Sequence, residues 1–95
     1  MTGLIESIRE EVELFERHLR ILELADREGP IGMGKISDEL DIPKHKVRYS
    51  LRILENEGLI KPSSEGAMIQ KDKTDEIKEK IQEQIDKLME LRELI

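Results

Sequence analysis

The chain has 95 residues, of which 37% are hydrophobic and 40% are charged, and its formal net charge is −6. This length suits one domain, and the hydrophobic share is too large for a disordered acidic tail. The absence of Cys excludes disulfides, thiolate zinc sites and cysteine nucleophiles. No apolar run approaches the roughly 20 residues that cross a bilayer, and the N-terminus lacks the regions of a signal peptide. We therefore expect a cytoplasmic protein without membrane contact.

Residues 1–28 have the spacing of one long amphipathic helix. Apolar side chains recur in steps of three and four at Ile5, Ile8, Val12, Phe15, Leu19 and Leu22. Such a heptad seam is typical of a helix that packs against a partner helix. Leu14, Ile21 and Leu24 widen the apolar surface in the second half. We predict a dimerisation helix that ends at Gly29-Pro30, with His18 at its surface or in the interface.

The C-terminal segment, residues 72–95, predicts a second long, coiled-coil-like helix. Its apolar positions include Ile77, Ile81, Ile85, Leu88 and Leu91. Gln84 lies in the same seam, where a polar residue can fix the register or the number of partners. One small domain does not need two long apolar stripes, which favours contact with a partner helix. The sequence leaves open whether the terminal helices pair within one chain or between chains.

Residues 29–71 form the middle segment and carry the most information. Met33, Ile36 and Leu40 recur at helical spacing before the break at Asp41-Ile42-Pro43. Because Pro disfavours helix in the residue before it and suits the first turn of a helix, a second helix is expected from Pro43 to Glu57. Ile42 is expected to fill the space between the two helices. A helix–turn–helix is therefore predicted.

The second of these short helices is basic on its outer face. With Val47, Leu51 and Leu54 turned inward, His45, Tyr49 and Arg52 point outward. Lys44 and Arg48 lie on one shoulder and Lys46 on the other. This helix has four Lys or Arg and no acid between positions 43 and 54, in a chain of net charge −6. Distant acids are screened beyond a Debye length of about 8 Å, so this local patch can attract a polyanion.

Two short extended runs follow, on either side of Ser63-Ser64-Glu65-Gly66, and predict a β-hairpin packed against the helices. The runs Lys35–Pro43 and Val47–Ile60 resemble winged helix–turn–helix transcriptional regulators of the MarR/ArsR/PadR type, in particular small archaeal examples. The segment Leu54–Ile60 carries the most specific part of the resemblance. The expected fold is mainly α with a small β-hairpin: a winged helix–turn–helix flanked by long N- and C-terminal dimerisation helices.

The resemblance implies that helix 43–57 enters the major groove of DNA and that the hairpin is a wing beside it. The expected DNA-binding residues are Lys44, His45, Lys46, Arg48, Tyr49, Arg52 and Lys61. Arg52 is expected at a guanine edge and His45 at a base, with the lysines and Arg48 near phosphates. Tyr49 is expected at a thymine methyl or a phosphate, or else packed across a dimer or on the wing. The acidic wing tip departs from many relatives and predicts little phosphate binding there.

The sequence lacks the constellations of an enzyme. The run Gly32–Lys35 has neither the preceding strand nor the spacing of a phosphate-binding loop. Ser37 and Asp38 have no His placed to complete a triad, and two widely separated His do not predict a metal site. We therefore expect no cofactor.

The preferred hypothesis is a homodimer that binds a pseudo-palindromic DNA operator and regulates transcription. The alternative is a winged-helix protein–protein interaction module that does not bind DNA. The negative net charge, a wing without cations at its tip and the two apolar helical stripes favour it. A third possibility, a small-molecule effector between the dimer helices, has no convergent polar pocket in the sequence to support it.

Overall fold

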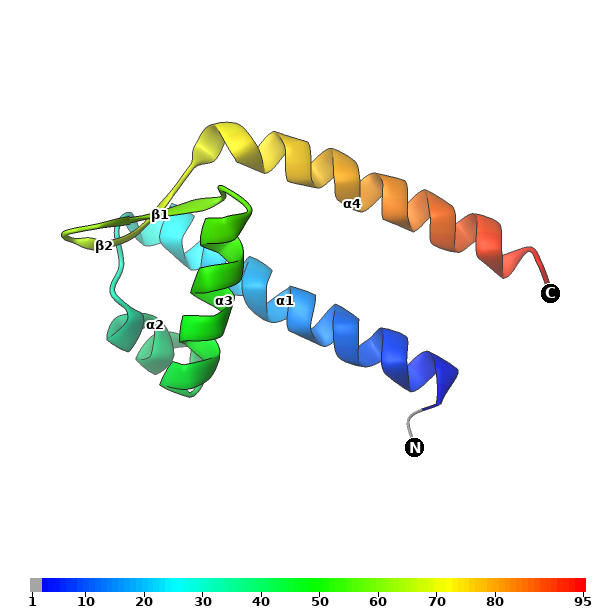
Figure 1. Ribbon diagram of the computed structural model, residues 1–95, viewed down its shortest axis with the longest axis horizontal. Coiled ribbons are helices and arrows are strands. Elements are labelled where there is room, and N and C mark those ends of the chain that lie inside the picture. The colour runs from blue at the N-terminus through cyan, green and yellow to red at the C-terminus, as the bar shows by residue number, and fades with distance from the viewer. Residues whose placement is uncertain (1–2) are drawn as a thin grey trace.

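The computed structural model describes residues 3–95 and confirms the expected mainly helical fold with a small hairpin (Figure 1). The elements in chain order are α1 (Leu4–Glu28), α2 (Met33–Leu40), α3 (Lys44–Asn56), β1 (Ile60–Ser63), β2 (Gly66–Ile69) and α4 (Lys71–Arg92). Helices α1, α2 and α3 pack together around the core, and the hairpin covers one end of it (Figure 1). Met1 and Thr2 of the predicted first segment lie outside the described residues.

The turn between α2 and α3 is fixed by local hydrogen bonds. The Ser37 hydroxyl donates to the carbonyl oxygen of Ile42 at 2.6 Å, and the Ile42 N–H donates back to the Ser37 carbonyl at 3.1 Å. Asp41 ends α2 in the left-handed conformation, with a φ of 54°, which Asp tolerates better than most residues. Ile42 packs against the core, as predicted. The turn therefore holds α2 and α3 at a set angle.

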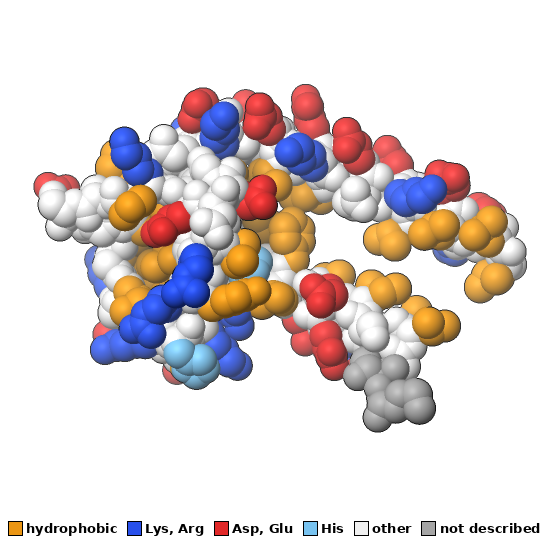
Figure 2. Space-filling view, viewed as in Figure 1, with side chains coloured by type: hydrophobic (Ala, Val, Ile, Leu, Met, Phe, Trp, Pro, Cys, Tyr) orange, Lys and Arg blue, Asp and Glu red, His pale blue; other side chains and the backbone are white. Residues whose placement is uncertain are grey.

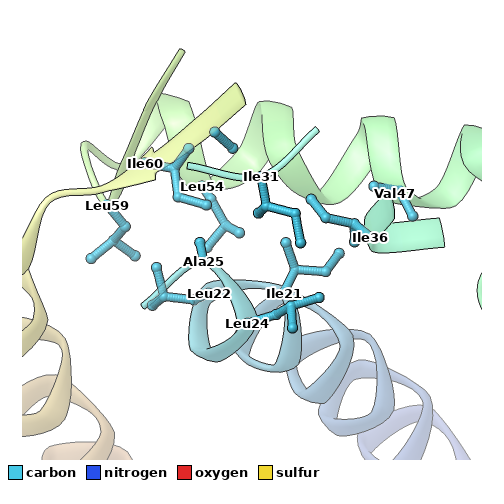
Figure 3. Close-up of a cluster of buried hydrophobic side chains, with 11 residues drawn as sticks. Ile21, Leu22, Leu24, Ala25, Ile31, Ile36, Val47, Leu54, Leu59 and Ile60 are labelled. Carbon is cyan, nitrogen blue, oxygen red and sulfur yellow. The ribbon is translucent and has the colours of Figure 1, made fainter. Parts of the chain in front are cut away.

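The core takes side chains from every element of the helix–turn–helix and the hairpin (Figure 3). Its buried members are Ile21, Leu22, Leu24, Ala25, Ile31, Ile36, Val47, Leu54, Leu59, Ile60 and Ala67. The second half of α1 supplies four of them, so this helix is part of the folded core. The hydrophobic effect is the main force that holds these elements together, at about 25 cal/mol for each Å² of apolar surface buried.

The hairpin is held against the helices by a third short strand segment. β1 and β2 pair antiparallel, with Ile60 opposite Ile69 and Ser63 opposite Gly66. Ile31 bridges to Ala67 through two backbone hydrogen bonds of 3.1 and 2.8 Å. This bridge, which the sequence did not predict, pairs the backbone N–H and carbonyl of Ala67 on the outer edge of β2. It also brings the backbones of Ile31 and Gly66 very close together.

Helices α1 and α4 extend from the core to the same side of the molecule (Figure 1). α4 has no buried residue within the described chain. Its start is tied to α1 by the Lys71 ammonium, 2.7 Å from the Asp26 carboxylate, and Ile77 packs partly against the core. Apolar side chains face one another across the gap between the two helices (Figure 2). They line a cleft of about 720 Å³.

Two sequence predictions for α1 are wrong. Leu22, predicted in the dimer interface, is only 6% exposed and belongs to the core of its own chain. His18, predicted at the surface or in an interface, is 8% exposed and packs against α3. Leu19 is also partly buried against the core. The apolar seam of α1 therefore has two parts. After about residue 18 it packs in the core, and before that residue it forms an exposed face.

Candidate nucleic-acid interface

Three buried residues fix the rotation of α3 about its axis. Val47, Ser50 and Leu54 point into the molecule and are at most 2% exposed. The helical period of 3.6 residues then forces the intervening side chains outward. All of the predicted DNA-binding residues are exposed: Lys44, His45, Lys46, Arg48, Tyr49 and Arg52 on α3, and Lys61 on β1. A run of Lys and Arg side chains follows α3 across the face in Figure 2.

The four cations of α3 form no ion pair with any other residue that the structure describes. Within residues 3–95, neither Lys44, Lys46, Arg48 nor Arg52 has a carboxylate within 4.0 Å. Most cations on the other helices do have such a partner, namely Arg9, Arg20, Arg27, Lys35, Lys71, Lys87 and Arg92. Unpaired, exposed cations are available to an external anion without first breaking an internal contact.

Lys46 has a different setting from the other three cations. It lines a shallow hollow of about 310 Å³ between α1 and the start of α3. Glu13 and Glu16 line the same hollow, together with Arg17 and Arg20. Arg20 is paired with Glu16 at 2.6 Å. Acids of α1 therefore lie near Lys46, whereas Lys44, Arg48 and Arg52 are outside this hollow.

The tip of the hairpin carries no cation. The Ser63 hydroxyl donates to the carbonyl oxygen of Gly66 at 2.6 Å and accepts the Glu65 N–H at 3.2 Å, which closes the turn. Lys61, in β1 opposite Met68, is exposed at the base of the hairpin. The positive charge of this surface therefore lies on α3, with Lys61 as the contribution of the hairpin.

Residues 14–61 match the winged helix-turn-helix DNA-binding family. The match covers half of the chain, from the second half of α1 to β1, and includes every predicted DNA-binding residue. The chain belongs to this family. No curated protein matches the chain. In the winged helix-turn-helix, α2 and α3 are the helix–turn–helix pair and the β1–β2 hairpin is the wing.

Tyr49 of the helix-turn-helix packs against α1, an arrangement that the sequence did not predict. Its ring lies 6.0 Å from the His18 ring, measured between centroids, and the Arg17 guanidinium lies 5.9 Å from the Tyr49 centroid. The side chain is still 46% exposed. Tyr49 thus lies at the edge of the outer face of α3 and connects that face with α1.

A buried polar cluster lies beside Tyr49 at the α1–α3 contact. The Arg17 Nε–H donates to Ser50 Oγ at 2.9 Å, and Ser50 Oγ lies 2.8 Å from Nδ1 of His18. Burial of the ring, and secondarily the charge of Arg17, lower the pKa of His18 below its usual range. When the His18 ring is neutral, Nδ1 can accept the Ser50 O–H while Ser50 accepts from Arg17. Sequence reasoning missed this cluster; a Ser in the buried stripe of α3 was its only signal.

The predicted dimer residues divide into two groups. Those near the core are Leu19, Leu22 and Ile77, which pack within their own chain. The others lie on the extended parts of α1 and α4: Ile5, Ile8, Val12, Phe15, Ile81, Ile85, Leu88 and Leu91. Most of this second group lines the α1–α4 cleft.

Within the described residues, no helix is both long and apolar enough to span a membrane.

Proposed function

We propose that the protein is a sequence-specific regulator of transcription that binds double-stranded DNA as a homodimer, and that it has no enzymatic activity. The observation that carries this proposal is the row of unpaired, exposed cations on α3 of a DNA-binding winged helix-turn-helix. α3 would be the recognition helix in the major groove, where side chains reach the base edges. The resemblance of Lys35–Pro43 and Val47–Ile60 to MarR/ArsR/PadR regulators supports a role in transcription.

Each residue of this surface has a role that its position supports. Arg52 can donate two hydrogen bonds to the O6 and N7 of a guanine, and His45 can donate to or accept from a base. Lys44, Lys46 and Arg48 can each neutralise a phosphate, which positions the helix without reading sequence. In addition, Lys61 can contact a phosphate at the base of the wing, and the exposed edge of Tyr49 can contact a thymine methyl or a phosphate. The acidic wing tip argues against deep reading of the minor groove.

The homodimer is proposed on the exposed apolar faces of α1 and α4. In α1, Ile5, Ile8, Val12 and Phe15 are between 39% and 66% exposed, although all four are large and apolar. An exposed patch of this kind marks an interaction site more often than a free surface. Two-fold pairing through these faces would place two recognition helices about 34 Å apart, one turn of DNA. The operator would then be a pseudo-palindrome.

Sedimentation of the protein with and without duplex DNA tests both parts of the proposal. We expect a dimer alone and one dimer on each duplex selected from a random-sequence library. Arg52→Ala should weaken binding to the selected duplex by about 1–3 kcal/mol and relax the choice of one base pair in each half-site. Lys78→Ala, a matched loss of charge on α4, should bind like the parent. A monomer, or an Arg52→Ala protein with unchanged affinity and sequence choice, would contradict the proposal.

A second candidate function is a winged-helix module that binds another protein. It is favoured by the net charge of −6 and by the acid at the wing tip. A gel shift with random-sequence duplex in low salt separates the two functions. Absence of a shift at micromolar protein would favour the interaction module, because non-specific DNA binding by a basic recognition helix is typically seen in this range.

A further inference from the structure

Helix α1 connects two regions with different tasks. Its first half, residues 4–15, carries the exposed apolar face that is proposed to pair with a second copy. Its second half supplies Ile21, Leu22, Leu24 and Ala25 to the core. The helix is continuous through 25 residues, from Leu4 to Glu28. Any change of angle between α1 and α3 would therefore move the recognition helix relative to the dimer.

The polar cluster lies at the junction of these two halves. Arg17 holds α3 in two ways: its Nε–H donates to Ser50 Oγ at 2.9 Å, and its guanidinium packs on the Tyr49 ring at 5.9 Å. Ser50 is fully buried, so its oxygen is a fixed point of attachment. Apolar contacts have little directional preference, whereas a hydrogen bond weakens steeply when its angle is lost. The Arg17 contacts are thus suited to fix the tilt of α3 relative to α1.

A small tilt at this junction has a large effect on DNA geometry. Residues 4–15 of α1 form a lever about 18 Å long at 1.5 Å per residue. A tilt of about 10° over that lever displaces its end by about 3 Å, close to the 3.4 Å rise of one base pair. Variation in the angle between α1 and α3 would therefore widen the range of half-site spacings that the dimer can bind.

We propose that Arg17 is a positioning residue that sets the spacing of the two recognition helices, and thereby the spacing of half-sites that the dimer accepts. The inference rests on the proposed function, because it concerns a DNA-binding homodimer. In this role Arg17 acts through Ser50 and Tyr49, without a contact to DNA. Tyr49 accordingly has two roles: its ring packs against Arg17 of α1, and its exposed edge forms part of the outer face of α3.

The first test compares half-site spacings. The probes are synthetic duplexes that carry two inverted copies of a half-site selected by the parent protein. The distance between the copies is the selected one, or is longer or shorter by one or two base pairs. One further duplex carries a single half-site. The parent should prefer its best spacing by about tenfold over neighbouring ones. In Arg17→Met this preference should fall below about threefold, with the affinity for the single half-site within about twofold of the parent. Arg20→Met is the control and should keep the parental preference, because Arg20 lies one turn away and within residues 3–95 pairs only with Glu16.

The second test measures geometry without DNA. Because the chain has no Cys, Asn56→Cys places one spin label on the exposed end of α3 in each protomer. The distance between labels should be narrowly distributed in the parent background and in Arg20→Met, and broad in Arg17→Met.

Each contrary outcome has a distinct meaning. Parental spacing preference and a narrow label distance in Arg17→Met would overturn the positioning role. Equal loss of affinity for every duplex, the single half-site included, would also overturn it, since Arg17 would then act through DNA contact or stability. A parent protein that selects no duplex and gives no label–label distance would instead refute the proposed function itself.

Discussion

Lowering the pH from about 7.5 to about 5.5 should remove the contribution of the neutral His18 ring to the free energy of unfolding. The ring is buried against α3 beside Arg17, and both the burial and that charge lower its pKa in the folded protein. In the unfolded chain the pKa returns to its ordinary value of 6.5. Between these two values the unfolded chain binds more protons than the folded one. The contribution of His18 is therefore fully present above about pH 6.5 and is lost as the pH falls toward the folded-state pKa.

One proton limits the size of this effect. The free energy of unfolding can change by at most about 1.4 kcal/mol per pH unit within the window between the two pKa values. The structural reason is that a protonated ring would bring a second cation next to Arg17. Its Nδ1 would also become a donor, so the Ser50 O–H would lose its acceptor. The contact between α1 and α3 should weaken first.

Urea unfolding at a series of pH values measures the effect in the parent and in His18→Gln. The variant loses the titrating ring and keeps a polar side chain, so its stability should fall less steeply below pH 6.5. All other side chains are the same in the two proteins, so their contributions cancel in the comparison. His45→Gln is the control, since His45 is exposed on α3 and has no hydrogen bond or ion pair in the described chain. Parallel curves for the parent and His18→Gln would refute the assignment of a buried, neutral ring.

Four further substitutions test packing and dimerisation. Gly66→Ala should destabilise the protein by at least about 2 kcal/mol, because φ is +125° and the new Cβ would lie 2.4 Å from the backbone carbon of Ile31. Gly34→Ala should instead stabilise α2 by about 0.5–1 kcal/mol, because the new Cβ has open space around it. Thermal unfolding compares the two, and equal midpoints would contradict the close backbone approach. Leu22→Ala should lower the free energy of unfolding by about 2–5 kcal/mol. Ile8→Ala, half-exposed, should weaken dimerisation in sedimentation more than it lowers the stability of the subunit.

The surface of α3 could be predicted from the sequence because one helix with one buried stripe has a unique outer face. Once Val47 and Leu54 are inside, geometry fixes the exposure of Arg48 and Arg52. The turn at Pro43 is equally local in origin, since proline restricts both itself and the residue before it. The hairpin could be predicted from its Ser/Gly turn and two flanking extended runs. These features depend on short-range rules, and the structure confirms them.

The features that escaped prediction depend on what a residue meets in three dimensions. Apolar residues at steps of three and four look the same in sequence whether the helix packs on its own core or on a second chain. The pattern therefore predicts Leu22 in the dimer interface, whereas it packs in the core of its own chain. The extra apolar positions at Ile21 and Leu24 were the available signal that α1 enters the core. The contact between His18 and Ser50 joins residues 32 positions apart, so no periodic pattern in the sequence indicates it. Ile31 forms a bridge of a single residue, too short for an alternating pattern.

The salt dependence of duplex binding tests the central claim, that the cations of α3 bind the DNA backbone, most directly. If Lys44, Lys46, Arg48 and Lys61 each neutralise one phosphate in each protomer, a plot of log affinity against log salt should have a slope of about −7 for the dimer. Removing two of these cations in each protomer, with Lys44→Ala and Arg48→Ala together, should reduce the slope to about −4. The same slope in both proteins, or no duplex binding at micromolar protein in about 50 mM salt, would contradict the account.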